Sequence, residues 1–142
     1  MTKKAAEISR SGLDVEWQRL QVIAQNLANM NTTRTATGEP FRAMRLVSGP
    51  AGGFSEMLSA GDSGEPHGVA VMGVEAMPGG TRRVHEPGHP HADAEGFVDY
   101  PDIDHAGEMT LLIQASRAYE ANLAAISIAH QMYARALDLG RR

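Results

Sequence analysis

Apolar residues recur at steps of three and four near the beginning of the chain. They are Leu13, Trp17, Leu20, Ile23, Leu27 and Met30. This spacing places them on one face of a helix that we expect to run from about Ala5 to Asn31. Ser11 should cap the regular part of this helix, which begins at Leu13. The polar run from Asn29 to Thr33 should end it, because such side chains bond to their own backbone.

The last region, from His105 to Gly140, has a longer pattern of the same kind. Its positions are spaced alternately by three and four: Met109, Leu112, Ser116, Tyr119, Leu123, Ile126, His130, Tyr133 and Leu137. A second stripe of small residues lies beside it, at Ala115, Ala118, Asn122, Ala125, Ala129 and Ala136. Small residues let another helix come close, so the predicted helix has two faces to bury. At about 1.5 Å per residue it would be roughly 50 Å long, against roughly 27 Å for the regular part of the first helix from Leu13, which leaves part of it without an intramolecular partner.

The middle of the chain has a different character. Segments 41–47, 69–74 and 81–84 have the composition of short strands, and we expect the second and third to form a hairpin through residues 77–80. Residues 48–68 are rich in glycine and poor in large apolar groups, which predicts a mobile loop. The prolines that follow favour an extended connection to the last helix.

These patterns predict one α+β unit. Two long terminal helices should form an antiparallel coiled-coil-like pair, and a small antiparallel β-rich segment with a mobile loop should lie between them. We divide the chain into an N-terminal helical segment (1–33), a central segment (34–104) with its loop (48–68), and a C-terminal helical segment (105–142).

Charge and composition exclude several partners. Lys and Arg number 13 against 17 Asp and Glu, so a net charge of −4 gives no attraction to nucleic acid or anionic lipid. The longest apolar runs have four residues, far short of the roughly 18 that span a membrane, so we expect no membrane insertion. The beginning of the chain carries no evident cleavable signal, so export would need another route.

The most tempting chemical feature is a group of side chains that could hold a transition metal: His85, His89, His91, Asp93 and Glu95. The prolines among them exclude a helical metal motif, and a turn-rich surface segment is the simpler interpretation. A small metal-binding protein or metal-dependent enzyme is nevertheless the alternative hypothesis. No nucleophile elbow and no phosphate-binding loop are present, so we expect no cofactor and no catalytic residue.

The apolar surface favours an assembly protein instead. Two flanking helices and a sparse centre leave more apolar surface than one chain can cover. Six uncovered side chains at about 1.5–3 kcal/mol each would supply at most roughly 9–18 kcal/mol for association. An export adaptor or chaperone that holds a client with the same helices is a third, weaker interpretation, and it predicts a soluble dimer that does not polymerise.

Three segments carry a resemblance to a known family. They are Ser11-Gly-Leu13 with Ala24-x-Asn26-Leu-Ala-Asn29 and Asn31-Thr-Thr33; Pro87-Gly-His-Pro90 with Ala92-Asp93 and Gly96-Phe-Val98; and Glu108-Met109, Ile113, the run from Ala115 to Asn122, Met132, Ala136-Leu137 and Gly140. In this order and spacing the chain resembles the bacterial flagellar axial proteins, the family of rod and hook subunits. It departs from them at His91, where aspartate is usual, and at Asp102-Ile103, where asparagine followed by an apolar residue is common.

The resemblance implies a subunit of the flagellar rod, the periplasm-spanning shaft of the basal body that transmits torque from motor to hook. The implied partners are copies of the chain, other axial proteins in a helical assembly, and the flagellar type III export apparatus. Asn26, Asn29 and Asn122 would be polar anchors that fix helix register. The predicted assembly residues are Leu13, Leu20, Ile23, Asn26, Leu27, Asn29, Met109, Leu112, Tyr119, Asn122, Leu123, Ile126, Tyr133 and Leu137.

Overall fold

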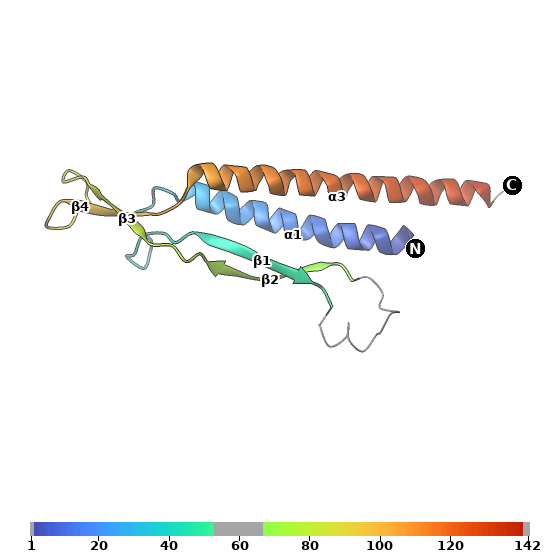
Figure 1. Cartoon of the computed structure of the whole chain (residues 1–142), viewed down its shortest axis with the longest axis horizontal. Coiled ribbons are helices and arrows are strands. Elements are labelled where there is room, and N and C mark those ends of the chain that lie inside the picture. The colour runs from blue at the N-terminus through green and yellow to red at the C-terminus, as the bar shows by residue number, and fades with distance from the viewer. Residues whose placement is uncertain (1, 53–66, 141–142) are drawn as a thin grey trace.

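Two long helices lie side by side and run in opposite directions (Figure 1). In this computed structural model, which describes residues 2–52 and 67–140, α1 spans Thr2–Ala28 and α3 spans His105–Leu139. Residues 2–10 therefore belong to α1, and the expected cap at Ser11 is wrong. Ser11 lies inside the helix, and its hydroxyl donates to the Ile8 carbonyl at 2.7 Å, one turn earlier, instead of capping a helix start.

Side chains bond to the backbone at the end of α1 and at the start of α3. At the end of α1, the Asn29 amide donates to the Gln25 carbonyl at 2.9 Å, and the Thr32 N–H donates to the Asn29 carbonyl at 3.0 Å. This confirms that the polar run ends the helix. At the start of α3, Asp104 is the N-cap, and its carboxylate accepts from the Ala106 N–H at 3.1 Å.

The first sheet is a pair of antiparallel strands, β1 (Met44–Pro50) and β2 (Val69–Ala76). Their register runs from Met44 opposite Ala76 to Pro50 opposite Val69, with an irregularity after Val47. β1 thus ends inside the segment 48–68 that we expected to be a mobile loop. Most of that segment, residues 53–66, lies outside the described residues, so the expectation stays a prediction there.

The second sheet pairs β3 (Thr81–His85) with β4 (Phe97–Pro101), again antiparallel. The predicted hairpin between β2 and β3 is therefore wrong. The linker stays extended because the Met77 N–H still bonds to Ala43 and the Gly80 carbonyl accepts from Asp102, so it leads from one sheet to the other instead of reversing. β4 was missed as a strand because its sequence ends in proline.

The elements form three layers, with α1 between α3 on one side and the β1–β2 pair on the other (Figure 1). The β3–β4 pair projects beyond the ends of the helices at which α1 finishes and α3 begins. The buried core is small and lies between α1 and β1, where Val15, Val22 and Leu46 meet. Within residues 2–52 and 67–140, no element covers one long side of α3.

Candidate assembly interface

The face of α3 that meets α1 is mainly the stripe of small residues. Buried positions recur every seven residues, at Glu108, Ala115 and Ala129, and the half-buried Asn122 completes the series. Leu112, Tyr119 and Ile126 alternate with them and are half-buried. Of the larger apolar residues that we expected on this seam, Met109 and Leu123 lie one position aside from Glu108 and Asn122 and are exposed.

Close approach of the two helices explains this choice of face. Gly12 of α1 lies opposite Asn122, and a Cβ atom added at Gly12 would come within 2.8 Å of the Asn122 amide nitrogen. Trp17 meets Tyr119 nearby, with ring centroids 6.4 Å apart. Backbones can approach only where side chains are small, so Met109 and Leu123 are left at the edge of the contact.

Asn26 ties all three layers together and is only 1% exposed. Its amide nitrogen donates to the Met44 carbonyl at 2.8 Å, and its amide oxygen accepts from the Met44 N–H at 2.9 Å. The same nitrogen donates to the Glu108 carboxylate at 3.2 Å, in a bond that is itself buried. Asn26 therefore pairs with the first residue of β1 as a neighbouring strand would, and it also holds the first turn of α3.

The other predicted α1 residues differ in their environment. Ile23 is buried, whereas Leu13, Leu20 and Leu27 are half-buried. The Asn29 side chain bonds only within its own turn, to Gln25 and Thr32.

A second face of α1 was missed by the sequence reasoning. Val15 and Val22 pack on Leu46 of β1, and the Ser11 hydroxyl accepts from the Val69 N–H at 3.0 Å. Arg19 reaches the Ser48 hydroxyl of β1 at 3.0 Å. The seven-residue step between the two valines was the available signal, but it was overlooked beside the stronger leucine stripe.

Large apolar side chains stand exposed along much of α3. They are Met109, Leu111, Ile113, Leu123, Ile128, Met132, Tyr133, Leu137 and Leu139. Met109, Leu123 and Leu137 lie along one side of α3 at steps of fourteen residues, and Leu111, Met132 and Leu139 lie along another side. Met109, Leu111 and Leu123 flank the contact with α1, whereas Leu137 and Leu139 lie beyond it. Leu123 is 52% exposed and Leu137 is 53% exposed. The structure thus places several predicted assembly residues outside the intramolecular contact.

The end of α3 has no partner among the residues that the structure describes. Ten positions separate Gly12 from Thr2, and the same step carries α3 from Asn122 to Met132, which should lie opposite the start of α1. The helix continues to Leu139, and Figure 1 shows its end projecting past α1. Tyr133 and Leu137 belong to this projecting end.

The side chains of His85, His89 and His91 contact different neighbours. His85 packs against Phe97, and His91 Nδ1 lies 2.8 Å from the Thr33 hydroxyl. His89 Nδ1 accepts from the His91 N–H at 3.0 Å. Within residues 2–52 and 67–140, no three histidine, aspartate or glutamate side chains converge as metal ligands would.

Asp93 shapes the turn before β4. Its carboxylate accepts from the Phe97 N–H at 2.7 Å and from the Glu95 N–H at 3.1 Å, and it forms an ion pair with Arg83. The hydrogen bond from Phe97, with smaller help from Arg83, holds the pKa of Asp93 below its ordinary value, although partial desolvation opposes this. Gly96 closes the same turn at a φ of +80°, a conformation that favours glycine. This carboxylate is therefore part of a turn.

Membrane insertion by a helix finds no support in the structure. Among the described residues, neither helix combines the length and the apolar character needed to cross a bilayer.

Comparison with known proteins decides the family. Residues 7–34 match the protein family described as "Flagella basal body rod protein". Residues 94–139 match the family described as "Flagellar basal body rod FlgEFG protein C-terminal". The flagellar basal-body rod protein FlgC of Escherichia coli O6:H1 is 35% identical over 135 residues, covering 95% of both chains. FlgC of Bacillus subtilis is 36% identical over 143 residues, covering 94% of this chain and 95% of its own. This chain belongs to the FlgC family of flagellar basal-body rod proteins.

Membership in the FlgC family settles the class of function. The chain is a structural protein of the flagellar rod and not an enzyme. The two matched regions coincide with α1 and with β4 and α3, so the likeness to rod proteins includes both helices of the pair.

Proposed function

We propose that this FlgC-family subunit assembles through the apolar edges of α3 that α1 leaves uncovered. In this proposal, α1 and α3 form a coiled-coil-like pair within the subunit, and neighbouring subunits cover Met109, Leu123 and Leu137. The seven-residue recurrence of buried positions on α3 supports the coiled-coil part. The observation that carries the proposal is the exposure of large apolar side chains along a helix of 35 residues.

The neighbours in this proposal are copies of the chain and other axial proteins of the rod. Full burial of a leucine side chain stabilises a complex by about 1.5–3 kcal/mol before ordering costs are subtracted. Several such contacts acting together resist shear, which is what a shaft that transmits torque requires. In this proposal the edges of α3 meet unlike surfaces of the neighbours, and such contacts extend into an open helical assembly when the rotation between neighbours does not close a ring.

Membership in the family also supports export through the flagellar type III apparatus. A rod subunit has to reach the periplasm, and this proposal sends the chain there unfolded and without cleavage of a signal peptide. A strain that lacks a working flagellar export gate should retain the chain inside the cell at its full length. Secretion of a shortened chain by such a strain would contradict this part of the proposal.

A substitution at Leu123 tests the assembly surface. Leu123 is half-exposed in the free subunit, so Leu123→Asp should leave the monomer folded but place a charge in a dry contact within the rod. We expect cells that carry only this variant to lose motility and to yield no rods with the subunit incorporated. Leu123→Met and Gln131→Asp are matched controls, one conserving the apolar contact and one adding the same charge at an exposed polar position. A motile Leu123→Asp strain would refute the proposed surface.

A further inference from the structure

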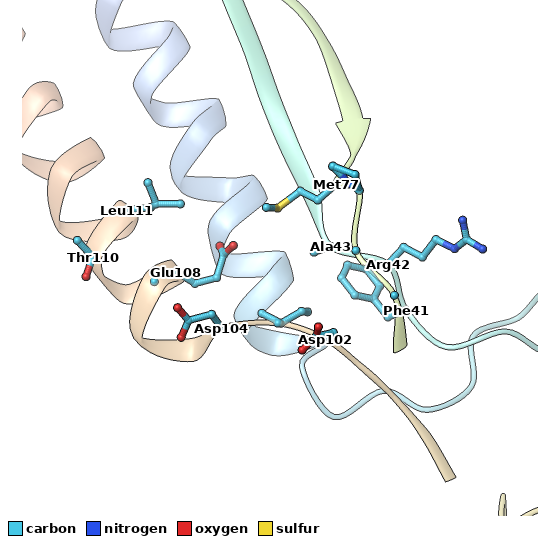
Figure 2. Close-up of a pocket in the computed structure, with 14 residues that line it drawn as sticks. Phe41, Arg42, Ala43, Met77, Asp102, Asp104, Glu108, Thr110 and Leu111 are labelled. Atoms are coloured by element: carbon cyan, nitrogen blue, oxygen red, sulfur yellow. The ribbon is translucent and has the colours of Figure 1, made fainter. Parts of the chain in front are cut away.

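A groove opens where the first turns of α3 and the residues just before them meet the segment that leads into β1 and the linker between β2 and β3. It has a volume of about 520 Å³ and lies between residues 41–43, 77–80 and 102–111 (Figure 2). Phe41, Met77, Ile103 and Leu111 supply large apolar side chains to its lining. Binding sites in proteins commonly measure about 300–1,000 Å³ and have mainly apolar walls, so the groove is large enough to hold several side chains of a partner.

The polar lining of the groove is mostly acidic. Asp102, Asp104 and Glu108 contribute three carboxylates, against the single guanidinium of Arg42. Asp104 is engaged in capping α3, and Glu108 accepts from Asn26. No hydrogen bond or ion pair to the Asp102 carboxylate occurs within the described part of the chain. The groove therefore suits an apolar segment that also carries positive charge.

The opposite end of α3 has this chemistry. Tyr133, Leu137 and Leu139 are exposed there, and Leu139 is 76% exposed. Arg135 lies among them, and the sequence continues with Arg141 and Arg142 against one acidic residue, Asp138. The projecting helix end is thus apolar and basic, whereas the groove is apolar and acidic.

We propose that this groove receives the C-terminal end of α3 from a neighbouring rod subunit. This inference rests on the proposed function and adds which surfaces meet. Leu111 in the groove and Leu139 at the helix end are 28 positions apart on one helix, which at about 1.5 Å per residue is roughly 42 Å, so a subunit cannot fill its own groove. The contact is head-to-tail, and repeated contacts of that kind extend along an axis instead of closing.

A peptide of residues 126–142 tests the contact against the full-length chain by fluorescence anisotropy. We expect saturable binding that weakens at higher salt, because charge contributes to it. Leu111→Glu in the full-length chain should weaken binding by about tenfold or more. Ile113→Glu is the matched control, because Ile113 is similarly exposed on α3 but lies outside the groove, and it should bind as the unaltered chain does.

Reversing the charges on both partners provides a second test, because a misfolded chain would not regain binding to the altered peptide. A peptide with Arg135→Glu, Arg141→Glu and Arg142→Glu should bind the unaltered chain about tenfold more weakly, and Asp102→Lys in the chain should restore part of that loss. Absence of saturable binding, or equal binding by the Leu111→Glu and Ile113→Glu chains, would overturn the inference. The proposed function would survive that result as long as Leu123→Asp still abolished rod assembly, so the two failures are distinguishable.

Discussion

Asn26 and Glu108, separated by 82 positions in the sequence, are joined by a buried hydrogen bond of 3.2 Å that links the end of α1 to the start of α3. The same asparagine holds β1 through both backbone groups of Met44. One amide thus fixes the register of three elements. A buried amide with satisfied partners tolerates few other placements, because any shift leaves a polar group unpaired.

Replacing Asn26 should loosen this junction strongly. In Asn26→Asp, the amide donor is lost and a second carboxylate is placed beside Glu108, so we expect the free energy of unfolding to fall by about 1–3 kcal/mol or more. Urea unfolding followed by circular dichroism measures the change. Asn29→Asp is the control: its side chain bonds only within its own turn, and it should cost less than about 1 kcal/mol. Equal losses in the two variants would show that the three-way junction does not stabilise the subunit.

Gly68 should be intolerant of a side chain. A Cβ atom there would overlap the Ser11 hydroxyl, which already accepts from Val69 and donates to Ile8. We expect Gly68→Ala to destabilise the contact between α1 and β2 by about 1–3 kcal/mol. Gly73→Ala adds the same methyl group within β2, which follows Gly68, at a position where nothing lies within 4 Å, and it should be neutral or slightly stabilising. Thermal unfolding of the two variants compares them directly, and a loss at Gly73 as large as that at Gly68 would contradict the packing described.

The turn around Asp93 should respond to acid. The pKa of Asp93 is lowered in the folded chain, chiefly by the hydrogen bond from the Phe97 N–H, so the ionised carboxylate stabilises the turn. That stabilisation is present above the unfolded pKa of about 3.9 and is lost as the pH falls through the lower folded pKa. NMR spectra of the Glu95 and Phe97 amides should therefore change in that acid range. In Asp93→Asn the change should be absent, and persistence of the same titration would assign it to another group.

Sequence periodicity was sufficient to predict both helices and the α+β class. The spacing of Leu13, Leu20 and Ile23 and of Leu112, Tyr119 and Ile126 depends only on the local helical repeat, which is why it could be recognised. The end of α1 and the start of α3 were also predictable, since Asn29 and Asp104 act through bonds to nearby backbone.

The choice of face could not be predicted in the same way. Two stripes lie side by side on α3, and which of them meets α1 depends on how closely the backbones approach at Gly12 and Asn122. Hydrophobicity alone predicts that the face with Met109 and Leu123 meets α1. Close approach of the backbones instead selects the face with Ala115 and the positions at seven-residue steps from it. The polar role of Glu108 was hidden for the same reason, because its partner Asn26 lies far away in sequence.

The pairing of the strands was predicted wrongly for a related reason. The glycines after Met77 suggested a local hairpin, but β1 pairs with β2 across a long connection and β3 pairs with β4. Pairing of distant strands depends on the layer beneath them, and here α1 supplies that layer through Val15 and Val22. The histidines of the next segment were candidates for a metal only because their turn geometry was unknown.

Site-specific labelling tests the central claim that neighbouring subunits cover α3. The chain has no cysteine, so Leu123→Cys provides a single reactive thiol in the assembly surface, and Glu95→Cys provides one in the exposed turn before β4. A maleimide probe should react with both variants as free subunits. In purified basal bodies that contain the variant, the thiol at position 123 should be protected and the thiol at position 95 should still react. Full reaction at position 123 in assembled rods would contradict the account.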